Sequence, residues 1–317
     1  MALLVIHTGG TIGMVQTDAG FAPRSGVLET AIEELRAAGQ VSTEVHVQGF
    51  DPLIDSAQAT PADWAKIAAT IHAEYDRYDG FVVTHGTDTL AYTAAALCLG
   101  LRGLRKPVIV TGAMLPLTVE GTDGTRNLND ALTAASEAPA GVWVQFAGNL
   151  LHGGRVRKSH SHAFDAFEAE TVMTPPVIPA ETLNLAQVQD HRVGVVSITP
   201  GTCTELIRFA ADTCAGIVLR CYGSGTAPDT PALRAALRRA QERQIPVVAV
   251  SQCAEGGIRL GTYAAGGVLR ETDVIDGRDM TPEMAYAKVQ FALSQFENID
   301  SQREYLTTCQ CGEYTAA

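Results

Sequence analysis

Residues 81–93, FVVTHGTDTLAYT, contain the strand-to-helix transition on which the predicted fold depends. The stretch opens with a β-branched and aromatic run, turns at Gly86 and continues into an alanine- and leucine-rich helical pattern over 91–101. Thr87 and Asp88 therefore fall at the junction between a strand and a helix. In an open α/β sheet, such junctions lie at the carboxyl edge of the strands, where ligands bind.

A hydroxyl and a carboxylate beside a glycine form a candidate nucleophile and partner, because the glycine lets a ligand approach the backbone. The alternative is that Thr87 or Asp88 only caps the helix. Similar loops follow other predicted strands, which favours a site: Gly9-Gly10-Thr11, Asp55-Ser56 and the backbone of Gly112-Ala113. Because the carboxyl ends of parallel strands face one edge of a sheet, these loops can converge.

Size and charge restrict the class of protein. The chain has 317 residues, of which 46% are hydrophobic and 18% charged, and it is long enough for two domains. A formal net charge of −12 argues against a nucleic-acid partner and against binding to anionic membranes. No apolar run reaches the ~18 residues of a membrane span. The N-terminus enters a strand directly, without the segments of an export signal, so we expect a cytoplasmic location.

Strands alternate with helices along the whole chain, which indicates parallel sheets with crossover helices. The predicted fold class is α/β, with a larger N-terminal parallel-sheet (flavodoxin-like) domain over 1–178, a linker over 179–192 and a smaller C-terminal α/β domain over 193–317. The linker is expected because this stretch is polar and proline-bearing. The clearest expected helices are 28–38, 61–75, 89–101, 126–136, 203–212, 231–243 and 282–297.

No metal is expected. The seven cysteines are scattered and odd in number, which suits reduced thiols. Cys309 and Cys311 have metal-like spacing, and so do His160 and His162, but neither pair has the further ligands that a metal site needs.

A threonine hydroxyl is a poor nucleophile at neutral pH, so it needs a base and a site for the oxyanion. Lys158, in the polar segment 148–176, is the better base candidate, whereas His85 is expected to pack. A lysine acts as a base only in its neutral form, and a neighbouring Asp88 would favour the charged form. The alternative is that Lys158 is a solvated loop charge. The run 9–13, GGTIG, lacks the spacing of nucleotide-binding loops.

Five motifs together resemble the bacterial L-asparaginases, and the resemblance covers nearly the whole chain: TGGTIG at 8–13, DS at 55–56, HGTDT at 85–89, TGAM at 111–114 and RKSH at 157–160. The absence of an export signal, with YDGFV at 78–82 and LRCYG at 219–223, is similar to the cytoplasmic type I branch. The resemblance implies hydrolysis of the side-chain amide of L-asparagine to L-aspartate and ammonia through an acyl-enzyme, without a cofactor.

The resemblance also implies roles for single residues. Thr11 matches the threonine nucleophile, and Thr87, Asp88 and Lys158 match the second threonine, the acid and the lysine. The residues expected to bind the substrate are Gly10, Asp55, Ser56, Gly86 and Ala113. Of these, Asp55 and Ser56 match the loop that holds the α-carboxylate, and the backbone at Ala113 would face the amide; Asp88 would hold the α-ammonium. Family members are usually homotetramers built from dimers, so the resemblance implies a homodimer or homotetramer.

The chain departs from the family pattern at two places. Phe21, in a Gly-Phe-Ala-Pro context, stands where the family commonly has a tyrosine, so a hydroxyl that could relay a proton to Thr11 is missing. The run 223–226, GSGT, stands where the family has Gly-x-Gly-Asn, so an asparagine that can help a neighbouring active site is missing.

Some type I members have a second, allosteric asparagine site, and Arg220 and Cys253 match positions in it. The alternative is that Arg220 makes an internal ion pair and that Cys253 belongs to the core. For the activity, the alternatives are a mixed asparaginase/glutaminase, an amidotransferase subunit and a catalytically weak asparagine-binding sensor.

Overall fold

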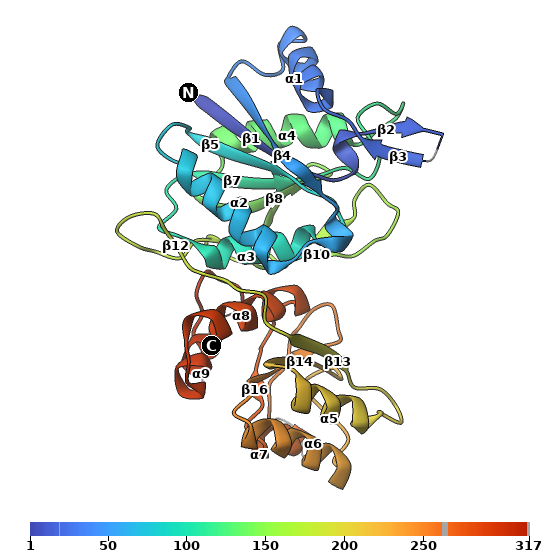
Figure 1. Cartoon of the computed structure of the whole chain (residues 1–317), viewed down its shortest axis with the longest axis vertical. Helices are drawn as coiled ribbons and strands as arrows, with labels where there is room; N and C mark the ends of the chain where they lie inside the picture. The colour runs from blue at the N-terminus through green and yellow to red at the C-terminus, as the bar shows by residue number, and fades with distance from the viewer. Residues whose placement is uncertain (19, 262–265, 316–317) are drawn as a thin grey trace. The chain divides into compact units, whose positions relative to one another are not determined.

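The computed structural model describes residues 1–18, 20–261 and 266–315, and the chain forms two compact units, Met1–Leu185 and Ala186–Ala317 (Figure 1). Helices alternate with parallel strands in both units. The predicted α/β class is therefore confirmed.

The first unit is built on a six-stranded sheet with the order β4-β1-β5-β7-β8-β9. Every neighbouring pair is parallel except β8 and β9. The parallel strands follow the 2-1-3-4-5 order of flavodoxin-like sheets, in which ligands bind where the order reverses, here between β1 and β5. The strands are β1 (Ala2–Gly9), β4 (Glu44–Ile54), β5 (Gly80–Thr84), β7 (Pro107–Thr111), β8 (Gly141–Phe146) and β9 (Asn149–His152).

Helices cover both faces of this sheet. Helices α1 (Val27–Ala37) and α4 (Gly124–Glu137) lie on one face, and α2 (Pro61–Glu74) and α3 (Leu90–Gly100) on the other (Figure 1). Helix α2 begins as predicted, because Asp63 accepts a 2.8 Å hydrogen bond from the backbone N–H of Thr60 in a capping box. Helix α1 buries the predicted apolar stripe, Leu28, Ala31, Ile32 and Leu35.

Several short elements have no counterpart in the predictions. The segments that were expected to be irregular or to form a linker contain β9, β10, β11 and β12. Strands of two residues show no hydrophobic period, so the sequence pattern cannot reveal them. The short elements of this unit are η1 (Thr11–Gly13), the hairpin of β2 (Met14–Thr17) and β3 (Gly20–Pro23), η2 (Ser56–Gln58), the pair β6 (Leu101–Arg102) and β12 (Asn184–Leu185), and the pair β10 (Arg157–Lys158) and β11 (Phe167–Glu168).

The second unit contains a four-stranded parallel sheet with the order β13-β14-β15-β16. Its elements are β13 (Val193–Ser197), α5 (Thr204–Thr213), β14 (Gly216–Cys221), α6 (Pro231–Glu242), β15 (Val247–Ser251), α7 (Gly267–Glu271), β16 (Ile275–Asp276), α8 (Pro282–Gln295) and α9 (Ile299–Thr307).

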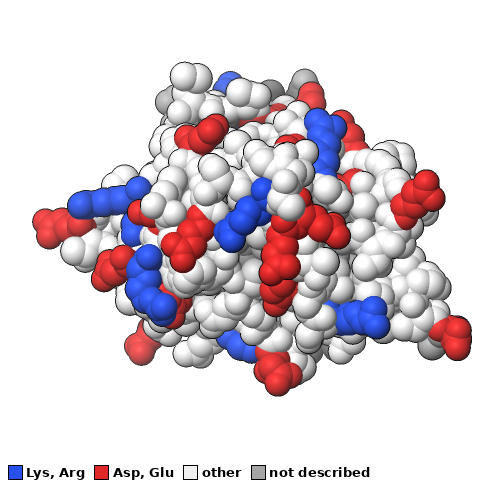
Figure 2. Space-filling model, turned by 90° about the horizontal axis from the view of Figure 1, so that it is seen from above, with Lys and Arg blue, Asp and Glu red and all other residues white. Residues whose placement is uncertain are grey.

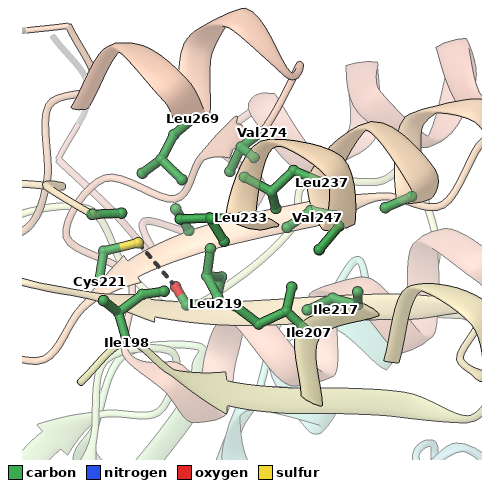
Figure 3. Packing of buried hydrophobic residues seen from close by; sticks show 14 of the residues in the cluster. Ile198, Ile207, Ile217, Leu219, Cys221, Leu233, Leu237, Val247, Leu269 and Val274 are labelled. Carbon is green, nitrogen blue, oxygen red and sulfur yellow. Dashed lines mark hydrogen bonds between the residues drawn. The ribbon is translucent and has the colours of Figure 1, made fainter. Parts of the chain in front are cut away.

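An apolar cluster joins this sheet to its helices (Figure 3). Leu233 and Leu237 of α6 pack with Leu219 of β14 and with Ile207 of α5. Cys221 lies in the same cluster, its thiol 3.7 Å from the carbonyl oxygen of Leu219. Burial raises the pKa of the Cys221 thiol to about 12, so this cysteine is a packing residue and no nucleophile.

Candidate active site

Three loops at the carboxyl edge of the first sheet pack closely against one another. The loop after β1 carries Gly10 and Thr11, and the loop after β5 carries Gly86 and Thr87. A Cβ atom at Gly10 would clash with the backbone of Gly86, and a Cβ atom at Gly86 would overlap the hydroxyl of Ser56. The structure therefore brings together the predicted glycines and the loops of Thr11, Ser56 and Thr87, at the point where the strand order reverses.

Lys158 joins this group from β10. Its ammonium donates a 2.9 Å hydrogen bond to the Thr87 hydroxyl and lies 3.3 Å from the carboxylate of Asp88. The side chain of Lys158 is 23% exposed, whereas that of Asp88 is 62% exposed. The alternative that Lys158 is a solvated loop charge is thus wrong, because the β10–β11 ladder holds it against the threonine.

The capping interpretation of Thr87 and Asp88 is also wrong. Helix α3 begins at Leu90, its N-cap position is Thr89, and no side chain caps it. The Thr89 hydroxyl instead donates a 2.7 Å hydrogen bond to the carbonyl oxygen of Ser56. Thr89 therefore ties two loops of the site together, which sequence reasoning missed because its partner lies 33 residues away.

Two buried side chains at the start of α4 hold the loop of Ala113. The carboxylate of Asp123 accepts 2.9 Å hydrogen bonds from the N–H groups of Met114 and Leu115. The amide of Asn127 donates a 3.0 Å hydrogen bond to the carbonyl oxygen of Gly112. Ala113 itself is buried, with 1% of its surface exposed. Neither Asp123 nor Asn127 was predicted, because nothing local marks them.

Asp55 stabilises its own loop. Its carboxylate accepts hydrogen bonds from the N–H of Ala57, at 3.0 Å, and from the side-chain amide of Gln58, at 3.2 Å. It serves as the N-cap of η2. Both hydrogen bonds of the Asp55 carboxylate therefore stabilise the loop that carries Ser56.

Two histidines lie just beneath the two threonine loops. His85 is buried, as predicted, but it also makes hydrogen bonds with the Gly86 carbonyl oxygen, at 2.8 Å, and with the Thr93 hydroxyl, at 3.0 Å. His7 lies 2.8 Å from the Thr84 hydroxyl through Nδ1. Burial lowers the pKa of both imidazoles, which outweighs the opposing effect of nearby partners. Both rings therefore favour the neutral form.

Arg220 and Cys253 belong to the second unit. Arg220 ends β14, and Cys253 follows β15. In the part of the chain that the structure describes, the Arg220 Nε atom is buried without a hydrogen-bond partner and its guanidinium forms no ion pair. Cys253 is exposed. The alternative that Arg220 makes an internal ion pair is therefore wrong, and so is the alternative that Cys253 belongs to the core.

Phe21 lies on β3 opposite Gln16 of β2, in the hairpin that follows the Thr11 turn. Its side chain is 45% exposed, which is unusual for a phenylalanine. The ring therefore contributes little to the core.

Figure 2 shows lysine and arginine side chains scattered among acidic ones on the face that it displays. Within residues 1–18, 20–261 and 266–315, no group of three or more histidine, cysteine, aspartate and glutamate residues could hold a metal ion. In the same ranges, no helix has the length and apolar character needed to cross a membrane.

Hydroxyl, ammonium and carboxylate groups lie together at the reversal point of this flavodoxin-like sheet, which is the arrangement of a candidate hydrolytic site. Comparisons with known proteins identify the protein family. Residues 2–189 match the family model "Asparaginase, N-terminal", and residues 192–306 match "Glutaminase/Asparaginase C-terminal domain". The chain therefore belongs to the asparaginase family of amidohydrolases.

Full-length relatives agree with this assignment. The chain is 38% identical to L-asparaginase 1 of Escherichia coli (strain K12), over 99% of this chain and 98% of the relative. It is 34% identical to an L-asparaginase of Thermococcus kodakarensis, over the whole of both chains. The crystal structure of L-asparaginase I from Vibrio cholerae is 36% identical and covers 99% of both chains with a TM-score of 0.88.

Proposed function

We propose that this protein hydrolyses the side-chain amide of L-asparagine to L-aspartate and ammonia. The observation that carries the proposal is the 2.9 Å hydrogen bond from Lys158 to Thr87, beside a glycine contact that brings in the loop of Thr11. A threonine nucleophile needs a neighbouring proton acceptor, and we assign this role to Thr87 and Lys158, whose mutual hydrogen bond supports the proposal.

In the proposed reaction, the Thr11 hydroxyl oxygen forms a bond to the amide carbon. Its proton passes to the amide nitrogen, the C–N bond breaks, and ammonia leaves an aspartyl ester on Thr11. A water molecule then attacks the ester carbon, its proton passes to the Thr11 oxygen, and the bond between that oxygen and the acyl carbon breaks, so that aspartate and free threonine result. Thr87 and Lys158 form the path along which these protons move.

The charges around the site suit the two ends of an amino acid. Asp88 is mostly exposed and can accept the α-ammonium of the substrate. The Ser56 loop can receive the α-carboxylate, because the Ser56 hydroxyl is a hydrogen-bond donor and lies against Gly86.

Ammonia release from purified protein tests the proposal. The Thr11→Ala and Thr87→Ala variants should each lose activity by a factor on the order of 10³ or more. Thr133→Ala, which removes an exposed hydroxyl from α4, is the matched control and should be fully active. Full activity in both site variants would contradict the proposal.

Two further assays separate the alternatives. Comparable kcat/KM on glutamine would indicate a mixed asparaginase/glutaminase. Tight asparagine binding in calorimetry, without ammonia, would indicate a binding sensor.

We also infer a second asparagine site that includes Arg220 and Cys253. The buried Arg220 Nε, which has no partner among the described residues, supports a role in binding a carboxylate. The velocity curve for asparagine should be sigmoidal, and Arg220→Met should make it hyperbolic. Arg238→Met, on the exposed side of α6, should leave the curve unchanged. A hyperbolic curve for the unmodified protein would exclude the second site.

We infer further that the chain forms a homodimer or homotetramer. Leu206 and Phe209, one helical turn apart on α5, are 59% and 65% exposed. Light scattering should give the mass of two or four chains, and Phe209→Glu should lower it. A monomer mass for the unmodified protein would refute this. The seven free cysteines support a reducing, cytoplasmic location.

A further inference from the structure

His85 is a buried polar residue to which the proposed reaction assigns no role. Its Nδ1 lies 2.8 Å from the carbonyl oxygen of Gly86, and its Nε2 lies 3.0 Å from the hydroxyl of Thr93. A carbonyl oxygen only accepts hydrogen bonds, so Nδ1 must carry the proton. In the neutral ring, Nε2 then accepts a hydrogen bond from Thr93. The surroundings therefore select one tautomer.

This hydrogen bond fixes the direction of the peptide between Gly86 and Thr87. The peptide is trans, so its C=O and N–H point in opposite directions. Because the carbonyl points to the buried imidazole, the N–H of Thr87 points away from it. No acceptor for this N–H occurs among the residues that the structure describes. The N–H is therefore available to a ligand.

The neighbouring backbone leaves this peptide little freedom. The N–H of His85 donates a 2.8 Å hydrogen bond to the carbonyl oxygen of Thr111. Cβ atoms at Gly112 and Gly10 would clash with the carbonyl oxygen of His85 and with the backbone of Gly86. Gly112 and Gly10 thus pack directly against the backbone of His85 and Gly86. The hydrogen bond from the imidazole to the Gly86 carbonyl oxygen then fixes the orientation of the peptide between Gly86 and Thr87.

We propose that His85 is a positioning residue: it holds the Gly86 carbonyl so that the N–H of Thr87 faces the substrate oxygen on which negative charge develops. The proposal rests on the proposed amide hydrolysis, in which the carbonyl oxygen of the side-chain amide becomes an oxyanion. A preoriented N–H stabilises such an oxygen without having to reorganise during the reaction. Leucine at position 85 could fill the same space but could not orient the peptide.

Two substitutions isolate the Nδ1 hydrogen bond. In His85→Asn, the side-chain amide nitrogen occupies the place of Nδ1 and can still donate to Gly86. His85→Leu has no donor. Both variants lose the acceptor for Thr93, so they differ in the one hydrogen bond that matters. Thr93→Val, which keeps the Nδ1 donor, is a further control.

We expect His85→Leu to lower kcat while leaving KM nearly unchanged. His85→Leu should lower kcat for asparagine by about 10- to 100-fold, because a misdirected donor costs transition-state stabilisation. Its KM should change by less than about threefold, as expected for an interaction made only in the transition state. His85→Asn and Thr93→Val should stay within about threefold of the unmodified kcat. Equal kcat values in His85→Leu and His85→Asn would overturn the proposal. A fall in kcat that simply parallels the fall in melting temperature across the variants would overturn it as well.

Nuclear magnetic resonance gives a readout that does not depend on activity. The ¹⁵N signals of the His85 ring should show a protonated Nδ1 and a free Nε2. The backbone amide signal of Thr87 should move in His85→Leu and stay in place in His85→Asn, without substrate. The opposite tautomer, or an unmoved Thr87 signal in both variants, would overturn the positioning role. A failure of the unmodified protein to release ammonia would instead count against the proposed hydrolysis.

Discussion

The ammonium of Lys158 donates a 2.9 Å hydrogen bond to the hydroxyl of Thr87, although 71 residues separate them in the chain. The two-residue pairing of β10 with β11 holds the lysine in place, and the loop after β5 supplies Thr87. The amine and the hydroxyl thus form one hydrogen-bonded pair at the reversal point of the sheet, where ligands bind in this fold.

Removal of the Lys158 amine should abolish most of the activity. Lys158→Met should lower kcat for asparagine by a factor on the order of 10² to 10⁴, the usual contribution of general acid–base catalysis. Lys158→Arg keeps the charge but cannot release its proton at neutral pH, so it should be about as inactive. Both variants would be assayed by ammonia release, with thermal unfolding as the control for folding. Near-normal activity of Lys158→Arg would show that the charge alone suffices.

A hydroxyl restored at position 21 should speed the reaction. Phe21 is 45% exposed on the hairpin after Thr11, so a tyrosine fits there without disturbing the core. If a phenol relays a proton to Thr11, Phe21→Tyr should raise kcat several-fold, whereas Phe21→Leu should not. Steady-state ammonia release measures both. An unchanged kcat in Phe21→Tyr would mean that the proton follows another path.

The ion pair between Lys288 and Glu313 should dominate the stability of the second unit's C-terminal segment. Both side chains are fully buried and lie 2.6 Å apart. Glu313→Gln leaves the Lys288 charge without its partner and should cost about 3–5 kcal/mol of unfolding free energy. Urea unfolding at pH 7 measures this, and Glu304→Gln on the exposed side of α9 is the control. A loss below about 1 kcal/mol would contradict the prediction, since that is the range of exposed pairs.

The same pair predicts a pH dependence. Burial opposes ionisation of Glu313, but the Lys288 ammonium and the hydrogen bonds to the carboxylate hold its pKa below the ordinary 4.5. A carboxyl with a depressed pKa stabilises the folded protein fully above its ordinary value, and this contribution is lost as the pH falls through the folded pKa. The difference in unfolding free energy between the unmodified protein and Glu313→Gln should therefore shrink below pH 4.5. A difference that stays constant to pH 3 would contradict the assignment.

Sequence patterns predicted the parts of this protein that depend on local chemistry. The stripe of α1 and the capping box at Thr60 follow from helical spacing and end chemistry, and both are present. The contacts that complete the candidate site are long-range: Lys158 with Thr87, and Thr89 with Ser56. Motif order suggested that these loops meet, but no spacing rule gives their hydrogen bonds. The support from Asp123 and His85 was missed because a buried polar residue looks ordinary until its partners are known.

The location of the acyl group during turnover tests directly whether Thr11 is the nucleophile. Protein mixed with L-asparagine would be quenched in acid within milliseconds, digested and mapped by mass spectrometry, with Thr87→Ala and Lys158→Met included to slow the hydrolysis of the ester. We expect an aspartyl group on the peptide that contains Thr11, together with one ammonia for each ester formed. An aspartyl group on the Thr87 peptide of the unmodified protein, or ammonia released in a burst without any ester, would contradict it.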